Sequence, residues 1–284
     1  MPSDDDNPLL AQLRAGQTTF VRQGRGSAVI LAHGVGMATS FWSGQLAALS
    51  AHFNVVAYDL MGHGGSELPS EAVSLADYAR QLITLMDDLG VASAHLVGHS
   101  MGALVVLETA LRHPERVLSV TAMNAVYCRS AEQRSAVESR AKSLSRDDMA
   151  PDAALERWFG NVNPSAHAGA ASLVRHLLTS VDPAGYARTY RLFATSDDAH
   201  VGRLAGLESP ALFITGECDP NSTPAMSRAM AAIAPLGAAA IIAGERHMMS
   251  LTSPMEVNQR LLEFLLTSDR ARSSASTHLR GSEA

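Results

Sequence analysis

The feature that most constrains this chain is a regular alternation of short apolar runs with longer amphipathic segments. Residues 74–89 and 101–112, which lie between such runs, carry apolar side chains at the spacing of one helix face. Strands that alternate with helices in this way favour a mostly parallel sheet with helices on both faces. We therefore predict an α/β fold whose buried strands lie at 28–32, 54–58, 94–98, 117–123, 211–215 and 238–242.

Residues 127–204 interrupt the alternation, because they contain helical patches and no convincing strand. We predict an all-helical insertion there, with patches at 132–144, 153–159 and 170–178. Residues 1–126 and 205–267 then form two parts of one core domain. The last segment, 268–284, is rich in serine and arginine and has little to bury, so we expect a disordered tail.

Composition narrows the functional class. Of the 284 residues, 46% are hydrophobic and 18% are charged, which is typical of a globular enzyme with a sizeable core. The net charge of −6 and the lack of a basic patch argue against nucleic acid as a partner. No apolar stretch is long enough for a bilayer, and the acidic start does not resemble a signal peptide. We expect a cytoplasmic protein that acts on a small molecule and does not bind a membrane.

The only cysteines, Cys128 and Cys218, lie far apart and belong to no metal-ligand pattern. A disulfide framework or a structural zinc site is therefore not expected. We expect neither a metal nor a cofactor.

Gly98-His99-Ser100-Met101-Gly102 is a G-x-S-x-G motif that joins a predicted strand to a predicted helix. So sharp a turn needs glycines around a residue held in a strained conformation, and it leaves the serine hydroxyl exposed above the sheet. The alternative is an ordinary glycine-rich turn with a passive serine. The flanking strand and helix favour Ser100 as a nucleophile.

A serine hydroxyl is a poor nucleophile near neutral pH, so it needs a histidine base and a group that orients that base. After a nucleophile elbow these partners follow in the order acid, then histidine. If the acid follows strand 211–215, only two of the 11 histidines come later in the chain, namely His247 and His278. His278 falls in the expected tail. We predict His247 as the base and Asp219 as the acid, with Glu217 as the rival acid.

The oxyanion of an acyl-transfer intermediate needs two backbone N–H donors. One is expected from Met101, the residue after the nucleophile. The second is expected from Val35, in the loop that follows the first predicted strand. We expect His33, Asp59 and His63 to brace neighbouring loops rather than to catalyse.

Several segments of the chain, between about Val29 and Leu266, resemble the α/β-hydrolase superfamily. They are L-A-H-G-V-G (31–36), Y-D-L-M-G-H-G-G-S (58–66), L-V-G-H-S-M-G (96–102), H-P-E-R-V (113–117), G-E-C-D-P (216–220) and R-H-M (246–248). The resemblance implies the same nucleophile, acid and base, and it implies that the insertion at 127–204 is a cap over the active site. Within the superfamily the chain looks like bacterial carboxylesterases and 3-oxoadipate enol-lactonases, with carbon–carbon bond hydrolases as neighbours. Ser100 argues against haloalkane dehalogenases and most epoxide hydrolases, which carry Asp at this position.

The leading hypothesis is hydrolysis of an ester or lactone of a small organic acid through an acyl-Ser100 intermediate. Alternatives are cleavage of a carbon–carbon bond in a ring-fission dienone by the same residues, cofactor-free oxygenation, and a slow-turnover ligand receptor. The insertion supplies aromatic side chains for a pocket and arginines that can pair with a substrate carboxylate. These candidates are Trp158, Phe159, Tyr186, Tyr190, Phe193, Arg175, Arg188 and Arg191.

Overall fold

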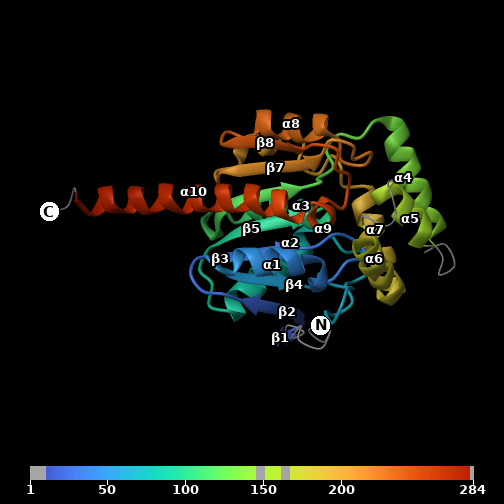
Figure 1. The fold of residues 1–284 in the computed structure, drawn as a ribbon, viewed down its shortest axis with the longest axis horizontal. Coiled ribbons are helices and arrows are strands. Elements are labelled where there is room, and N and C mark those ends of the chain that lie inside the picture. Colours follow the sequence, from blue (N-terminus) through green and yellow to red (C-terminus); the bar gives the residue numbers. More distant parts are fainter. Residues whose placement is uncertain (1–10, 145–150, 161–166, 282–284) are drawn as a thin grey trace, which may run out of the picture.

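An eight-stranded sheet, in the order β1-β2-β4-β3-β5-β6-β7-β8, lies at the centre of the computed structural model, which describes residues 11–144, 151–160 and 167–281 (Figure 1). At one edge, β1 (Leu13–Ala15) and β2 (Thr18–Gln23) pair in antiparallel fashion, and β2 is antiparallel to β4. The other strands run parallel: β3 (Ala28–Ala32), β4 (Asn54–Tyr58), β5 (Ala94–His99), β6 (Val117–Met123), β7 (Ala211–Gly216) and β8 (Gly237–Ile242). The predicted α/β fold is confirmed, and the two antiparallel edge strands are an addition to it.

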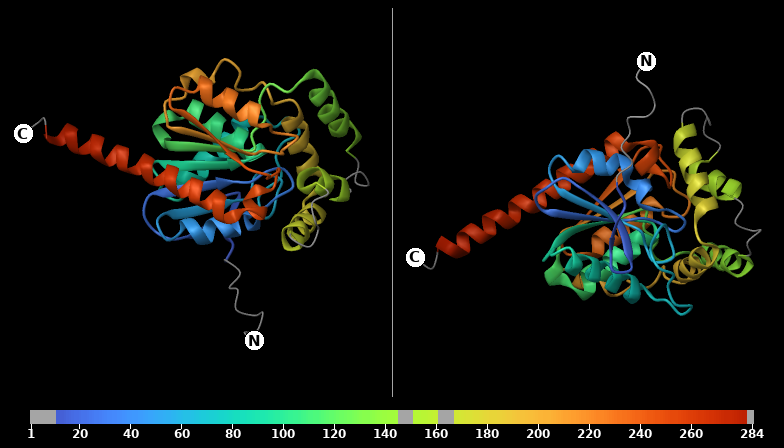
Figure 2. Two further views of the ribbon diagram at one scale, coloured as in Figure 1. Left: turned by 45° about the horizontal axis from the view of Figure 1, so that its top comes forward. Right: turned by 90° about the horizontal axis from the view of Figure 1, so that it is seen from below.

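Helices cover both faces of the sheet (Figures 1 and 2). One face carries α1 (Ser43–Leu49), α9 (Met249–Thr252) and α10 (Pro254–Gly281). The other carries α2 (Leu75–Asp88), α3 (Met101–Arg112) and α8 (Pro224–Ile233). Single 3-10 turns lie at Thr39–Trp42, Pro114–Arg116 and Leu204–Gly206.

The start of α2 shows how local sequence sets an element boundary. The Ser74 side chain accepts a hydrogen bond from the Asp77 N–H at 3.3 Å, and the Asp77 carboxylate accepts one from the Ser74 N–H at 2.9 Å. This reciprocal capping box satisfies two N–H groups that the first turn of a helix leaves unpaired.

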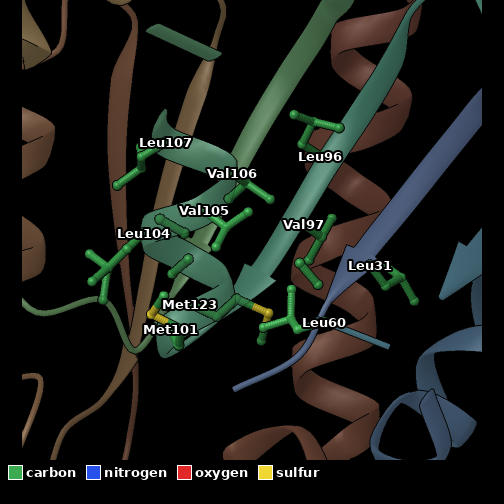
Figure 3. Close-up of a cluster of buried hydrophobic side chains, with 14 of the residues drawn as sticks. Leu31, Leu60, Leu96, Val97, Met101, Leu104, Val105, Val106, Leu107 and Met123 are labelled. Atoms are coloured by element: carbon green, nitrogen blue, oxygen red, sulfur yellow. The ribbon is translucent and has the colours of Figure 1, made fainter. Parts of the chain in front are cut away.

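Helix α3 is apolar and buried on nearly every side, because it lies between the sheet and α2. Figure 3 shows apolar side chains of α3, such as Val105 and Val106, beside Leu96 and Val97 of β5. Because close packing on all sides fixes the orientation of α3, the first turn of this helix is held in place at the end of β5.

Between β6 and β7 the described residues form four helices, which we call the cap helices: α4 (Ala131–Ser143), α5 (Pro151–Phe159), α6 (Ala168–Ser180) and α7 (Pro183–Ala194). Helix α4 packs on α7, and α5 packs on α6. They gather at one end of the sheet, whereas the end of α10 projects from the opposite side (Figure 1).

The segment 268–284 differs from the expected disordered tail, because α10 continues as far as Gly281 (Figure 2). The first residues of the extension are anchored: Ser268 is buried, and Asp269 Oδ1 lies 3.0 Å from His95 Nε2. Alanine and arginine recur beyond them, and both are favourable in helices. The final three residues, 282–284, lie outside the described chain. No helix in the described ranges has the length and apolarity needed to cross a membrane.

Two glycines permit the tight passage from β5 into α3. A Cβ atom on Gly102 would lie 2.0 Å from the carbonyl oxygen of Ala32, and one on Gly98 would lie 2.1 Å from the carbonyl oxygen of Gly102. Both contacts are with backbone atoms, so a larger residue would force β3, β5 and α3 apart.

We therefore expect Gly102→Ala to lower the free energy of unfolding by about 1–3 kcal/mol or more, measured by urea denaturation. Gly169→Ala is the matched control, because it also lies in a helix and its added Cβ would meet nothing within 4 Å. The control should keep or slightly raise stability. A Gly102→Ala protein as stable as the wild type would contradict the close approach.

Candidate active site

Ser100 occupies the single-residue turn between β5 and α3. Its backbone has φ 55° and ψ −113°, a conformation that costs a residue with a side chain roughly 1–3 kcal/mol. The Ser100 N–H donates to the carbonyl of Met123 at 2.9 Å, which ties the turn to β6. The G-x-S-x-G motif thus forms the sharp strand-to-helix elbow that the sequence predicts.

Asp219 and His247 meet from two separate loops. Asp219 follows β7, and His247 lies between β8 and α9. His247 Nδ1 lies 2.8 Å from Asp219 Oδ2, and both side chains are buried. Glu217 is exposed, and its Oε2 accepts from the Gly244 N–H at 2.9 Å. Of the two rival acids, Asp219 is therefore the one that contacts His247.

The Asp219 carboxylate is held by three donors. Besides His247, it accepts from Asn124 Nδ2 at 2.8 Å on Oδ2 and from the Asn221 N–H at 2.8 Å on Oδ1. Burial alone would raise the pKa of Asp219, but the charge and hydrogen bond of His247, with Asn124 and Asn221, bring the pKa below its usual value. Asn124 was not among the predicted site residues. Its one signal in the sequence is its position directly after β6, where the carboxyl ends of parallel strands meet.

The loops after β3 and β4 are braced by buried polar groups, as expected. His33 Nε2 accepts from the Leu60 N–H at 3.0 Å, and His63 Nε2 accepts from the Gly36 N–H at 2.9 Å. Asp59 accepts from two further backbone N–H groups of the same loops. These bonds fix the path of the loop that contains Val35.

The backbone N–H groups of Val35 and Met101 make no hydrogen bond within the described part of the chain. The Gly36 and Met37 N–H groups beside Val35 are paired. The loop also approaches the elbow closely, since a Cβ atom on Gly34 would lie 3.1 Å from Ser100 Cβ. Two unpaired donors beside the serine can stabilise negative charge on an oxygen held there.

A cavity of about 210 Å³ lies between these loops and the cap helices, and Val35, Ser100 and His247 line it on the core side. Predicted pocket residues form the opposite wall. The Trp158 ring stacks over the His247 imidazole with centroids 6.0 Å apart, and the Tyr186 and Tyr190 rings are stacked at 5.8 Å. Phe193 lines the same wall.

The arginines predicted for the pocket lie elsewhere. Arg188 donates to the Pro69 carbonyl and pairs with Glu71 at 3.6 Å, and Arg191 is exposed. Tyr186, Tyr190 and Phe193 share one face of α7, and the two arginines between them in sequence do not line the cavity. Two further predicted pocket residues also lie outside the cavity: Arg175, which pairs with Asp152, and Phe159, which is half-buried.

Three other arginines line the cavity instead: Arg129, Arg140 and Arg157. Arg129 is committed to structure, because it pairs with buried Asp197 at 3.4 Å and donates to the carbonyls of two residues at the end of α7. Within the described residues, neither Arg140 nor Arg157 has a carboxylate partner.

Arg140 and Arg157 sit among aromatic rings. Arg140 Nε donates to the Tyr190 hydroxyl at 3.1 Å, and the Arg157 guanidinium lies 5.9 Å from the Trp158 ring centroid. Burial lowers the pKa of Arg157, and the positive charge of Arg140 lowers it further. The cavity therefore holds two cations whose charges the described residues leave unneutralised. Sequence patterns missed Arg140 because its helix, α4, is polar on most sides and does not reveal which face turns inward.

Residues 27–254 match the family described as the alpha/beta hydrolase fold, and the chain belongs to that family. Among its relatives is the (E)-2-((N-methylformamido)methylene)succinate hydrolase of Acinetobacter baylyi, 36% identical over 87% of this chain and 94% of the relative. The 3-oxoadipate enol-lactonase 1 of the same organism is 28% identical over 69% of this chain and 73% of that relative's length. The enol-lactonase structure from Burkholderia xenovorans LB400 has a TM-score of 0.80 at 26% identity, covering 90% of this chain and all of that one. The predicted family is confirmed, and the chain is a hydrolase.

Three buried histidines make stability depend on pH. Burial is the main cause that lowers the pKa from 6.5 to about 4 for His33, to about 3 for His63 and to about 3 for His99. Below pH 6.5 the unfolded chain therefore binds protons that the folded chain does not.

We expect the free energy of unfolding to fall as the pH drops from about 6.5 towards 4, by up to about 1.4 kcal/mol per pH unit for each such histidine. The raised pKa of Asp59 opposes this trend, because between 3.8 and the raised value the folded chain binds a proton that the unfolded chain does not. Urea midpoints at about pH 7.5, 6 and 5 measure the effect. A midpoint that stays constant over this range would show that the folded histidines do protonate.

Proposed function

We propose that this protein is a serine hydrolase that cleaves an ester, lactone or related acyl bond of a small carboxylated substrate through an acyl-Ser100 intermediate. The observation that carries the proposal is the 2.8 Å hydrogen bond between His247 and Asp219 at a cavity that Ser100 also lines. A base oriented by a buried acid, beside a serine on a strained elbow, is the arrangement that acyl transfer requires.

In the proposed acylation step, His247 Nε2 takes the proton of the Ser100 hydroxyl as Oγ attacks the acyl carbon. Asp219 occupies Nδ1, which leaves Nε2 free for the serine, and its negative charge stabilises the imidazolium that forms. The carbonyl oxygen becomes an oxyanion that the Val35 and Met101 N–H groups hold. Collapse of this intermediate breaks the acyl bond, and the imidazolium returns the proton to the leaving oxygen or nitrogen.

In the proposed deacylation step, a water molecule replaces the leaving group. His247 takes one proton from the water as its oxygen attacks the acyl carbon. The second intermediate then collapses, Ser100 Oγ leaves with the proton from His247, and the free acid is released. The same oxyanion donors serve both steps. The cap helices, which carry Trp158 over the imidazole, limit the access of bulk water to this chemistry.

The substrate class is inferred from Arg140 and Arg157. Two guanidinium groups without a carboxylate partner in the described chain suit a ligand that brings its own carboxylate, since arginine binds carboxylates with two parallel hydrogen bonds. The names of two relatives point the same way, because one contains succinate and the other 3-oxoadipate. The name of the first relative also contains a formamido group, so acyl bonds to nitrogen belong in the test panel.

Ser100 is tested with a fluorophosphonate probe and intact-mass analysis. We expect one adduct on the wild-type protein, none on Ser100→Ala, and labelling of His247→Ala slowed by at least about 100-fold. Ser50→Ala, a serine remote from the cavity, is the control and should label as the wild type does. An unlabelled wild-type protein, or a labelled Ser100→Ala protein, would refute the proposed nucleophile.

The carboxylate subsite is tested by comparing a carboxylated enol-lactone or amidomethylene succinate with neutral 4-nitrophenyl acetate. We expect Arg140→Gln and Arg157→Gln each to raise KM for the carboxylated substrate by about 10- to 100-fold, the value of one charge-assisted hydrogen bond. Turnover of the neutral ester should change by less than about threefold.

Arg191→Gln is the matched control, because Arg191 lies on a cap helix but outside the cavity. A ring-fission dienone completes the panel, since the same three residues would serve carbon–carbon bond cleavage. Equal losses on the charged and the neutral substrate would argue against a carboxylate subsite, and turnover of the dienone alone would overturn the proposed bond type.

A further inference from the structure

His99, the residue between β5 and Ser100 in the elbow, is a buried histidine that the proposed acyl transfer does not use. Only 1% of its surface is exposed. Its Nε2 lies 2.9 Å from the backbone carbonyl oxygen of His247. Because a carbonyl oxygen only accepts, Nε2 must carry the proton. Nδ1 is then an acceptor, and it has no hydrogen-bond partner in the described chain.

The ring of His99 is fixed on its other sides as well. Its centroid lies 4.7 Å from that of Phe41 and 5.0 Å from that of His247. A Cβ atom on Gly34 would lie 3.1 Å from its Nδ1, so the loop after β3 closes over that edge. Burial, with the nearby imidazole of His247, lowers the pKa of His99 to about 3. The ring therefore stays neutral at working pH and does not act as a second base.

The hydrogen bond joins two parts of the chain that are 148 residues apart. His99 is covalently next to Ser100, and its acceptor is the main chain of His247. In the described residues, this is the one hydrogen bond between the elbow at 98–102 and the loop at 245–248. Asp219 holds the side chain of His247, whereas His99 holds its backbone.

We propose that His99 is a positioning residue, whose Nε2–H donor sets the separation between Ser100 and His247. The inference rests on the proposed function, because the separation matters only if the imidazole takes the serine proton. Without the donor, the His247 loop would still be held by Asp219, by the bond from the Cys218 N–H to the Glu245 carbonyl at 2.8 Å, and by bonds from α9 to the Met248 carbonyl. None of these contacts reaches the elbow. A displacement of about 1 Å between reacting groups costs on the order of 100-fold in rate.

A packing role for His99 makes a different prediction. If the ring only fills space between Phe41 and His247, any side chain of similar size should serve. Glutamine reaches about as far as histidine and places an N–H donor near the Nε2 position, whereas methionine has a similar length and no donor. Asparagine keeps an amide but is too short to reach the His247 carbonyl.

The test compares His99→Gln, His99→Met and His99→Asn by steady-state kinetics on 4-nitrophenyl acetate and by the rate of fluorophosphonate labelling. We expect His99→Met and His99→Asn to lose about 10- to 100-fold in kcat and in labelling rate, with KM changed by less than about threefold. His99→Gln should stay within about fivefold of the wild type. If His99→Met fails to fold, His99→Asn provides the same contrast, and urea denaturation checks both.

Wild-type kcat and labelling in a folded His99→Met or His99→Asn protein would overturn the inference. Equal losses in the Gln, Met and Asn variants would also overturn it, because the N–H donor that glutamine restores would then make no difference. The proposed function fails in a different way, since an unlabelled wild-type protein would exclude the serine nucleophile before any His99 variant is made. A labelled wild-type protein with unaffected variants would leave the nucleophile in place and remove only the positioning role.

Discussion

The close contact of α3 with the end of β3 is the constraint on which the site depends. Because Gly102 carries no side chain, the first turn of α3 can lie against the Ala32 carbonyl, and the chain must then reverse within one residue. That residue is Ser100, whose left-handed φ is stabilised by the burial of α3 and by its bond to β6. The loop after β3 is drawn to the same point, which brings beside the serine the Val35 and Met101 N–H groups, for which the described residues offer no acceptor.

Much of this could be predicted because a parallel strand buried on both faces must be a continuous apolar run. Strands β3, β4 and β6 lie within the predicted bounds. Chain order and the position after β7 led to His247 and Asp219, which the structure brings into contact. The edge strands β1 and β2 were missed, since they are short and mix polar with apolar residues. Arg140 was missed for another reason. Which side of a cap helix faces inward depends on packing between helices, and a mainly polar helix such as α4 does not record it.

Histidine has several roles near the cavity, and burial separates them. His33, His63 and His99 have lowered pKa values and act as neutral groups with one donor and one acceptor nitrogen. The Nδ1 atom of His247 is hydrogen-bonded to a buried carboxylate, that of Asp219. None of the other three histidines lies as close to a carboxylate. Of these four imidazoles, only that of His247 has a carboxylate within hydrogen-bond distance, since Asp59 Oδ1 lies 4.0 Å from His33 Nε2.

The unneutralised charges of Arg140 and Arg157 have a consequence for how molecules arrive at the cavity. The chain as a whole carries a net charge of −6, so an anion at a distance meets a repulsive field. We expect the sign of the field to reverse at the cavity entrance, because low-dielectric aromatic walls concentrate the field of the two guanidinium groups. At moderate ionic strength, dissolved salt screens the charges on the outer surface over a distance of about 10 Å. It screens the enclosed guanidinium groups less. We therefore expect the proposed capture of a carboxylate to be a local event at the cavity entrance, which tolerates ionic strength better than attraction by an exposed basic surface would.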